Sequence, residues 1–210
     1  MSDRGTKGPA DQKSVSRRGF LTTVSSSAAA VAVAGAAMPA AAEPVPRDDS
    51  APTLIVLNVN GRKYRLGVEP RDTLISVLRE RLGLIGAKPG CERGECGACT
   101  VLMDGTTRYS CMTLAVEAQG ALITTIEGLA QGEELSDLQK AFIHEDGYQC
   151  GFCTPGQVLA AEGLLRKNPK PSLDEIRLGM SGNLCRCGAY GHIFKAVQRA
   201  ASTRTSGGAQ

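Results

Sequence analysis

Eight cysteines, arranged as two sets of four, constrain this chain of 210 residues more than any other feature. Disulfides, zinc sites and iron–sulfur clusters all use cysteine, so the spacing within each set has to decide among them. The first set comprises Cys91, Cys96, Cys99 and Cys111, and the second comprises Cys150, Cys153, Cys185 and Cys187.

The first set has the spacing Cys-x4-Cys-x2-Cys with a fourth cysteine further on, which is typical of a plant-type [2Fe–2S] cluster. Glycines between these cysteines allow a loop to wrap closely around a cluster and to direct N–H groups at sulfur. Structural zinc usually recruits two Cys-x2-Cys pairs, and a disulfide between Cys96 and Cys99 would close only a trivially short loop. The spacing therefore predicts a [2Fe–2S] cluster at the first set.

The second set combines a Cys-x2-Cys before one expected helix with a Cys-x-Cys after another, and the two pairs would converge if those helices pack antiparallel. Four thiolates in this arrangement could hold either a [2Fe–2S] cluster or zinc, and a cluster is favoured because the first set already implies electron transfer. A disulfide between Cys185 and Cys187 is disfavoured, since positions two apart rarely reach disulfide geometry. No Cys-x-His pair is present, which disfavours a Rieske centre.

Residues 1–42 have the features of a twin-arginine export signal. Paired arginines lie in the block Ser16–Leu21, a short apolar stretch covers about residues 28–37, and Ala40-Ala41-Ala42 offers a cleavage step. The apolar stretch is too short to span a bilayer, so no membrane anchor is expected. Because this route exports folded proteins that already hold their cofactors, we expect a periplasmic protein.

The charge distribution argues against nucleic-acid binding. The chain has 24 Lys and Arg against 21 Asp and Glu, but residues 1–42 contain five basic and two acidic residues, which leaves 19 of each in residues 43–210. A neutral mature chain without tryptophan has neither the charge nor the aromatic surface for nucleic acid.

Hydrophobic periodicity and turn residues predict an α+β chain. We expect a linker over residues 43–52 and a disordered tail over residues 204–210. Residues 53–127 are expected to contain two hairpins, a helix over 73–83 with Asp72 as its N-cap, and a short strand over 122–126. Residues 128–203 are expected to contain helices over 135–144, 155–167, 173–178 and about 192–200.

No catalytic residue is expected. His144 and His192 are the only histidines, and neither lies in a cysteine motif, so surface or helix-packing roles are favoured for both. No paired carboxylates and no phosphate-binding glycine motif are present.

The motifs GCERGECGACTV, QCGFCTPGQ and GNLCRCGAY carry a resemblance to a known family. Residues from about 53 to 200 resemble the small iron–sulfur subunit of molybdenum hydroxylases, the family of xanthine dehydrogenase and aldehyde oxidoreductases. The resemblance implies a plant-type ferredoxin-like β-grasp domain over 53–127, a four-helix domain over 128–203, and one [2Fe–2S] cluster in each. It also implies a cluster and not zinc at the second set.

The resemblance further implies that Gln149 and Cys187 lie near the molybdopterin of a partner subunit. Electrons would pass from there to the cluster of the second set, then to that of the first set, and then to FAD or another acceptor. One departure is that the family commonly reads CRCTGY where this chain has CRCGAY, which removes a threonine hydroxyl.

A signal followed by a separate small subunit is similar to the periplasmic aldehyde oxidoreductases, which oxidise aldehydes to carboxylic acids. The expected complex is a heterotrimer, in which a large subunit holds the molybdenum cofactor and a medium subunit binds FAD. An alternative is the same role in an N-heterocycle dehydrogenase, of the isoquinoline or nicotinate type, that delivers electrons to a cytochrome. A secreted binding module held by disulfides is an alternative from another class.

Overall fold

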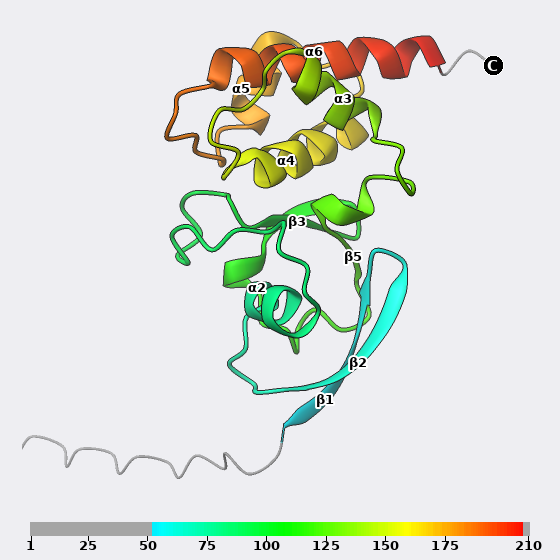
Figure 1. Ribbon diagram of the computed structural model, residues 1–210, viewed down its shortest axis with the longest axis vertical. Helices are drawn as coiled ribbons and strands as arrows, with labels where there is room; N and C mark the ends of the chain where they lie inside the picture. Colours follow the sequence, from blue (N-terminus) through cyan, green and yellow to red (C-terminus); the bar gives the residue numbers. More distant parts are fainter. Residues whose placement is uncertain (1–51, 208–210) are drawn as a thin grey trace, which may run out of the picture. The chain divides into compact units, whose positions relative to one another are not determined.

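The computed structural model describes residues 52–207, with side chains as far as Arg204 (Figure 1). The expected export signal over 1–42, linker residues 43–51 and residues 208–210 lie outside this part. Within it, a five-stranded mixed sheet precedes four α-helices along the chain, which confirms the predicted α+β class. None of the described helices combines the length and apolar character needed to cross a bilayer.

The first hairpin forms as the sequence predicts. Strand β1 (Thr53–Val59) pairs antiparallel with β2 (Arg62–Val68), and the turn between them is Asn60-Gly61. Both turn residues have positive φ, 51° and 76°, which is the conformation that makes Asn-Gly the preferred sequence of two-residue hairpin turns.

The second hairpin pairs β3 (Thr100–Met103) with β4 (Thr106–Tyr109) across the turn Asp104-Gly105. The short strand β5 (Leu122–Thr124) lies between the two hairpins, parallel to β1 and antiparallel to β3. The strand order is therefore β2-β1-β5-β3-β4.

The first helix differs from its prediction at both its start and its geometry. Its α-helical part, α2 (Leu74–Ser76), continues into a π-helical turn over Val77–Arg81. Asp72 was expected as the N-cap, but the N-cap is Thr73, whose side-chain oxygen accepts a hydrogen bond from the Ser76 N–H. The prediction was wrong because the Asp72 carboxylate is already used in the preceding turn, where it accepts the Glu69 N–H at 2.9 Å.

The remaining helices are α3 (Asp137–His144), α4 (Thr154–Lys167), α5 (Leu173–Gly179) and α6 (Tyr190–Gly207). Both α3 and α5 begin with a capping box, in which a serine and the side chain three residues later satisfy each other's backbone N–H.

Helix α6 runs beyond the predicted boundary at residue 203, into the segment where a disordered tail was expected. The reason lies in a buried carboxylate on the neighbouring helix. Glu162 of α4 is 6% exposed and forms ion pairs with both Arg166 and Arg204. A buried carboxylate needs such partners, so the last turns of α6 are held against α4.

The described residues contain two hydrophobic cores, one beneath the sheet and one among the helices. The first is built from strands and α2, with Leu57, Leu74, Leu78, Val101 and Ile123 among its buried residues. The second lies among α3 to α6, with Leu138, Phe142, Ile176, Ile193 and Val197 among its buried residues.

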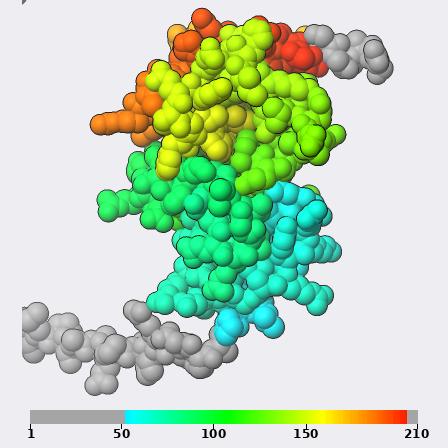
Figure 2. Space-filling view, in the orientation of Figure 1, coloured from blue at the N-terminus to red at the C-terminus, as the bar shows by residue number. Residues whose placement is uncertain are grey.

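Helix α4 packs directly on β3 and β4, so it joins the helices to the sheet (Figures 1 and 2). The contact is close because α4 presents glycine there: a Cβ added at Gly163 would lie 2.6 Å from Cγ2 of Thr107 and 3.3 Å from Cδ2 of Leu102. Real Cβ atoms do not approach that closely, so any side chain at this position would push the helix away from the sheet.

This packing predicts the effect of a single methyl group. We expect Gly163→Ala to lower the free energy of unfolding by about 1–3 kcal/mol, the usual cost of overpacking a well-packed contact. Gly191→Ala is the matched control, since Gly191 lies in α6 with no atom within 4 Å of an added Cβ. Urea unfolding of the full chain measures both; equal stability of the two variants would contradict the packing argument.

Candidate metal centres

The β3–β4 hairpin brings together two cysteines of the first set. Cys99 directly precedes β3, and Cys111 lies in the 3-10 turn Ser110–Met112 that follows β4. Because Thr100 is paired with Tyr109 in the hairpin, the two cysteines lie side by side, with their Sγ atoms 3.3 Å apart. Both are buried.

The other two cysteines of this set lie on the loop before β3 and are half-buried. The backbone N–H groups of Arg93 and Glu95 donate hydrogen bonds to Sγ of Cys91, at 3.4 and 3.3 Å. These bonds lower the pKa of the Cys91 thiol to about 7, and a contact with the Cys96 side chain contributes in the same direction. Cys91 and Cys96 therefore form a second pair, already hydrogen-bonded as a thiolate ligand would be.

In the buried pair, Cys99 and Cys111, the surroundings disfavour the thiolate form of Cys99. Burial raises the pKa of Cys99 to about 12, and the neighbouring Cys111 side chain adds to this effect. Removing a proton from such a thiol requires positive charge next to it, and a metal centre supplies that charge.

The second set also consists of two pairs. Cys150 and Cys153 lie between α3 and α4, and Cys185 and Cys187 lie between α5 and α6. The Phe152 N–H and then the Cys187 side chain lower the pKa of Cys150, whereas burial and then the Cys185 side chain raise the pKa of Cys153 to about 12. The pairs are thus Cys150 with Cys187, both exposed, and Cys153 with Cys185, both more buried.

This arrangement suits a two-iron centre. The four thiols of each set are arranged two by two, which matches a cluster in which each iron takes two cysteines. In the first set, Gly90 leaves space beside Cys96: a Cβ added at Gly90 would lie 2.9 Å from Sγ of Cys96.

The alternative of a disulfide-bonded module is wrong. All eight cysteines fall within the described residues, and all eight are free. The protein therefore has no disulfide on which such a module could depend.

The residues expected near a molybdopterin lie at the surface. Gln149 and Cys187 are both exposed, and Gln149 directly precedes the exposed Cys150. Gly188, where the chain departs from the family's threonine, has φ of 75°, a backbone conformation that glycine adopts without strain. Although no threonine hydroxyl is present here, the local backbone is hydrogen-bonded: the Gly188 N–H donates to the Cys185 carbonyl at 3.1 Å.

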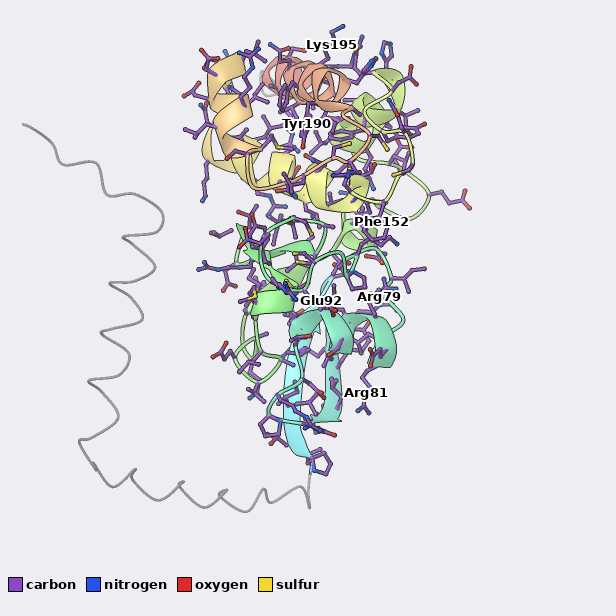
Figure 3. The ribbon with its side chains drawn as sticks, turned by 90° about the vertical axis from the view of Figure 1, so that its left-hand side faces the viewer. Arg79, Arg81, Glu92, Phe152, Tyr190 and Lys195 are labelled. Carbon is purple, nitrogen blue, oxygen red and sulfur yellow. The ribbon has the colours of Figure 1, made fainter. Side chains whose placement is uncertain are left out.

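Sequence reasoning missed several residues around the cysteines. Phe152 and Leu184, two large apolar side chains in the two loops of the second set, are 48% and 54% exposed. Phe152 lies where the helices meet the sheet (Figure 3), and its Cε1 is 3.6 Å from the position of a Cβ at Gly90. Their location inside the cysteine motifs was a signal that could have identified them.

The polar residue Asn183 was also missed. It is 5% exposed, and its side chain reaches the loop of the first cysteine set from the loop of the second. It also lies inside a cysteine motif, GNLCRCGAY, but its partner could not be predicted from sequence because the contact spans 86 positions of the chain.

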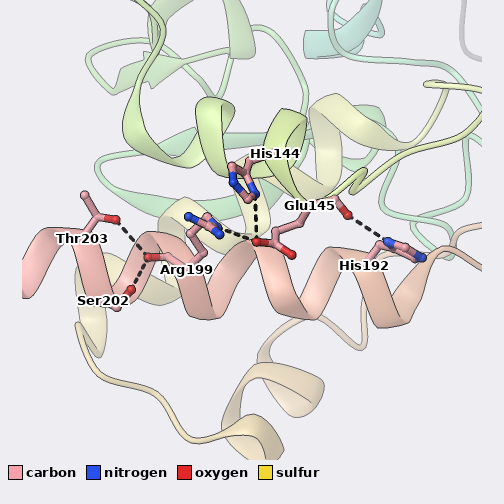
Figure 4. A network of polar contacts seen from close by, with 6 residues as sticks. All are labelled: His144, Glu145, His192, Arg199, Ser202 and Thr203. Atoms are coloured by element: carbon pink, nitrogen blue, oxygen red, sulfur yellow. Dashed lines mark hydrogen bonds and ion pairs between the residues drawn. The ribbon is translucent and has the colours of Figure 1, made fainter.

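The surface or helix-packing roles predicted for the histidines agree with their positions: His144 is largely exposed, and His192 of α6 contacts the end of α3. Figure 4 shows them around Glu145, at the end of α3: Nδ1 of His144 lies 3.1 Å from a carboxylate oxygen of Glu145, and Nδ1 of His192 lies 2.8 Å from its carbonyl oxygen. The same carboxylate pairs with Arg199, which lowers its pKa. This network ties α3 to α6 and lies apart from the cysteines.

Two family models match the chain in succession. The 2Fe-2S iron-sulfur cluster binding domain covers residues 57–123, and the [2Fe-2S] binding domain covers residues 125–198. Each match contains one complete set of four cysteines.

Curated relatives resemble the chain along most of its length. The aldehyde oxidoreductase iron-sulfur-binding subunit PaoA of Escherichia coli K12 is 45% identical over 90% of this chain and 89% of its own. The nicotinate dehydrogenase small FeS subunit of Eubacterium barkeri is 47% identical over 70% of this chain and 93% of its own.

Solved structures share the fold. Quinoline 2-oxidoreductase from Pseudomonas putida 86 matches with a TM-score of 0.72 and 48% identity, over 75% of this chain and 99% of that one. The aldehyde oxidoreductase from Desulfovibrio desulfuricans matches with a TM-score of 0.70 and 40% identity, over 73% of this chain but only 17% of that much longer one. With two cysteine sets in family-matched segments and near-full-length relatives, this chain belongs to the small [2Fe–2S] electron-transfer subunits of the molybdenum hydroxylases, the family of xanthine dehydrogenases and aldehyde oxidoreductases.

Proposed function

We propose that this chain is the electron-transfer subunit of a periplasmic, molybdenum-dependent aldehyde oxidoreductase that converts aldehydes to carboxylic acids. Its partners would be a large subunit with the molybdenum cofactor and a medium subunit with FAD, in a heterotrimer. The observation that carries this proposal is the extent of the match to the PaoA subunit, which covers 90% of this chain and so reaches into residues before 52.

Within this proposal, each cysteine set holds one [2Fe–2S] cluster. The ligands are Cys91, Cys96, Cys99 and Cys111 for one cluster, and Cys150, Cys153, Cys185 and Cys187 for the other. When bound, each cluster would accept and release one electron at a time.

The chain's own residues hold and tune these centres. The N–H groups of Arg93 and Glu95 stabilise negative charge on the Cys91 sulfur, and the Phe152 N–H does the same for Cys150. The exposed Gln149 and Cys187 would face the molybdopterin of the large subunit, because a partner can approach the second set only where it is open.

A second candidate function is electron transfer in an N-heterocycle dehydrogenase, with a cytochrome as acceptor. It is favoured by the 48% identity to quinoline 2-oxidoreductase and the 47% identity to the small FeS subunit of nicotinate dehydrogenase. Those matches cover 75% and 70% of this chain, against 90% for PaoA, so they leave most of the first 51 residues unmatched.

Substrate oxidation by the isolated complex distinguishes the two candidates. The complex purified through the full chain should reduce an artificial acceptor with aldehydes and should contain FAD. Turnover of nicotinate or quinoline without aldehyde turnover would replace the aldehyde proposal with the second candidate.

Metal content tests the cluster assignment. The purified full chain should contain about four iron atoms and about four acid-labile sulfides, in two centres with distinguishable EPR signals. Cys99→Ser and Cys185→Ser should each lower the iron content to about two and remove a different signal, so each variant serves as the control for the other. Zinc in place of iron, or loss of the same signal in both variants, would be incompatible with two separate clusters.

The export route is tested by conservative changes to the paired arginines. We expect Arg17→Lys combined with Arg18→Lys to retain the chain in the cytoplasm with its iron still bound, because recognition needs both arginines. Arg4→Lys is the matched control and should be exported normally. Cell fractionation measures the distribution; export of the double variant at the wild-type level would refute the twin-arginine assignment.

A further inference from the structure

The two cysteine-bearing loops meet at one place, where two consecutive residues of the second loop bind two consecutive carbonyls of the first. Nδ2 of Asn183 donates a hydrogen bond to the Gly97 carbonyl at 2.8 Å. The N–H of Leu184 donates to the Cys96 carbonyl at 2.9 Å. Cys96 is a ligand candidate of the first set, and Cys185 of the second set follows Leu184 directly, so these bonds connect the two sets.

The side-chain nitrogen of Asn183 makes two contacts here. Besides the Gly97 carbonyl, its Nδ2 lies 3.1 Å from Oγ1 of Thr100, which is 1% exposed and itself donates to the Gly97 carbonyl. The carbonyl of Asn183 accepts a hydrogen bond from Nε2 of Gln157, on α4, at 2.9 Å. Asn183 is thus fixed to α4 through its backbone and to the first loop through its side chain.

No other side chain separates the loops here. A Cβ added at Gly97 would lie 2.4 Å from the Gly182 carbonyl oxygen, and one added at Gly156 would lie 2.4 Å from the Gly97 carbonyl oxygen. The hydroxyl of Tyr109 donates to the Gly182 carbonyl at 2.9 Å from the sheet side. Since main chain contacts main chain, a small shift of Asn183 changes the distance between the cysteine sets.

We propose that Asn183 is a positioning residue that fixes the distance between the two cysteine sets and thereby sets the coupling between their clusters. This rests on the proposed function, since it requires both clusters to be bound. One electron at a time crosses between the sets, and no bond forms or breaks. The rate of such a transfer falls exponentially with distance, so the contact matters for electron transfer even though it touches no cysteine sulfur.

The test is Asn183→Asp in the full chain, a change of nearly identical shape. It replaces the donor Nδ2 with a carboxylate oxygen, which would face the Gly97 carbonyl in a buried site and repel it. We expect an unchanged iron content of about four per chain, but a reduced or lost magnetic splitting between the two reduced centres in low-temperature EPR. Hydrogen exchange of the Leu184 N–H should accelerate about tenfold or more, because its bond to Cys96 opens.

Two further variants separate positioning from stability. Ile55→Val trims a buried side chain of β1, which belongs to neither cysteine loop and does not take part in the packing of α4 on the sheet, so it should lower stability and leave the splitting unchanged. Thr100→Val removes one of the two contacts of Nδ2 and should change the splitting less than Asn183→Asp does.

The outcomes distinguish a failure of the positioning role from a failure of the proposed function. If Asn183→Asp keeps its full iron content and the wild-type magnetic splitting, the positioning role is wrong. It is also wrong if only one set loses iron, because Asn183 would then be needed to retain a cluster and not to fix the distance between the two. Absence of iron from the wild-type chain would overturn the proposed function and, with it, this inference.

Discussion

The approach of main chain to main chain between the cysteine loop at Gly97 and the start of α4 at Gly156 is the constraint on which the rest of the structure depends. It brings the first cysteine set, which belongs to the sheet, next to the second, which belongs to the helices. Each part has its own hydrophobic core, and α4 joins the two parts by packing on β3 and β4. At the cysteine loops, polar groups and backbone make the contact.

Each cysteine set has a buried pair and a more accessible pair, and a partner can approach each set only on the side of its accessible pair. The buried pairs contain Cys99 and Cys153, whose thiols are strongly disfavoured as free anions. The accessible pairs contain Cys91 and Cys150, whose anions receive backbone hydrogen bonds. A centre built in this way is shielded on one side and open on the other, which suits a subunit that only receives and passes on electrons.

Much of the fold and most of the site could be predicted from local sequence. Turn dipeptides such as Asn60-Gly61 specify their own backbone angles, and cysteine spacing identifies a ligand set whatever surrounds it. Three of the misses involve competition or distance. The Asp72 carboxylate serves a preceding turn and not the helix, and α6 extends because a buried carboxylate on another helix requires Arg204. Asn183 binds a partner 86 positions away, which no local pattern reveals.

The hydrogen bonds from Asn183 and Leu184 also impose an order on biosynthesis. All four cysteines of the first set are translated by residue 111, whereas the residues that close over its carbonyls come much later in the chain. The second set is complete only with Cys187, immediately after that closure. A growing chain therefore contains all four cysteines of the first set before it contains the residues that cover this loop.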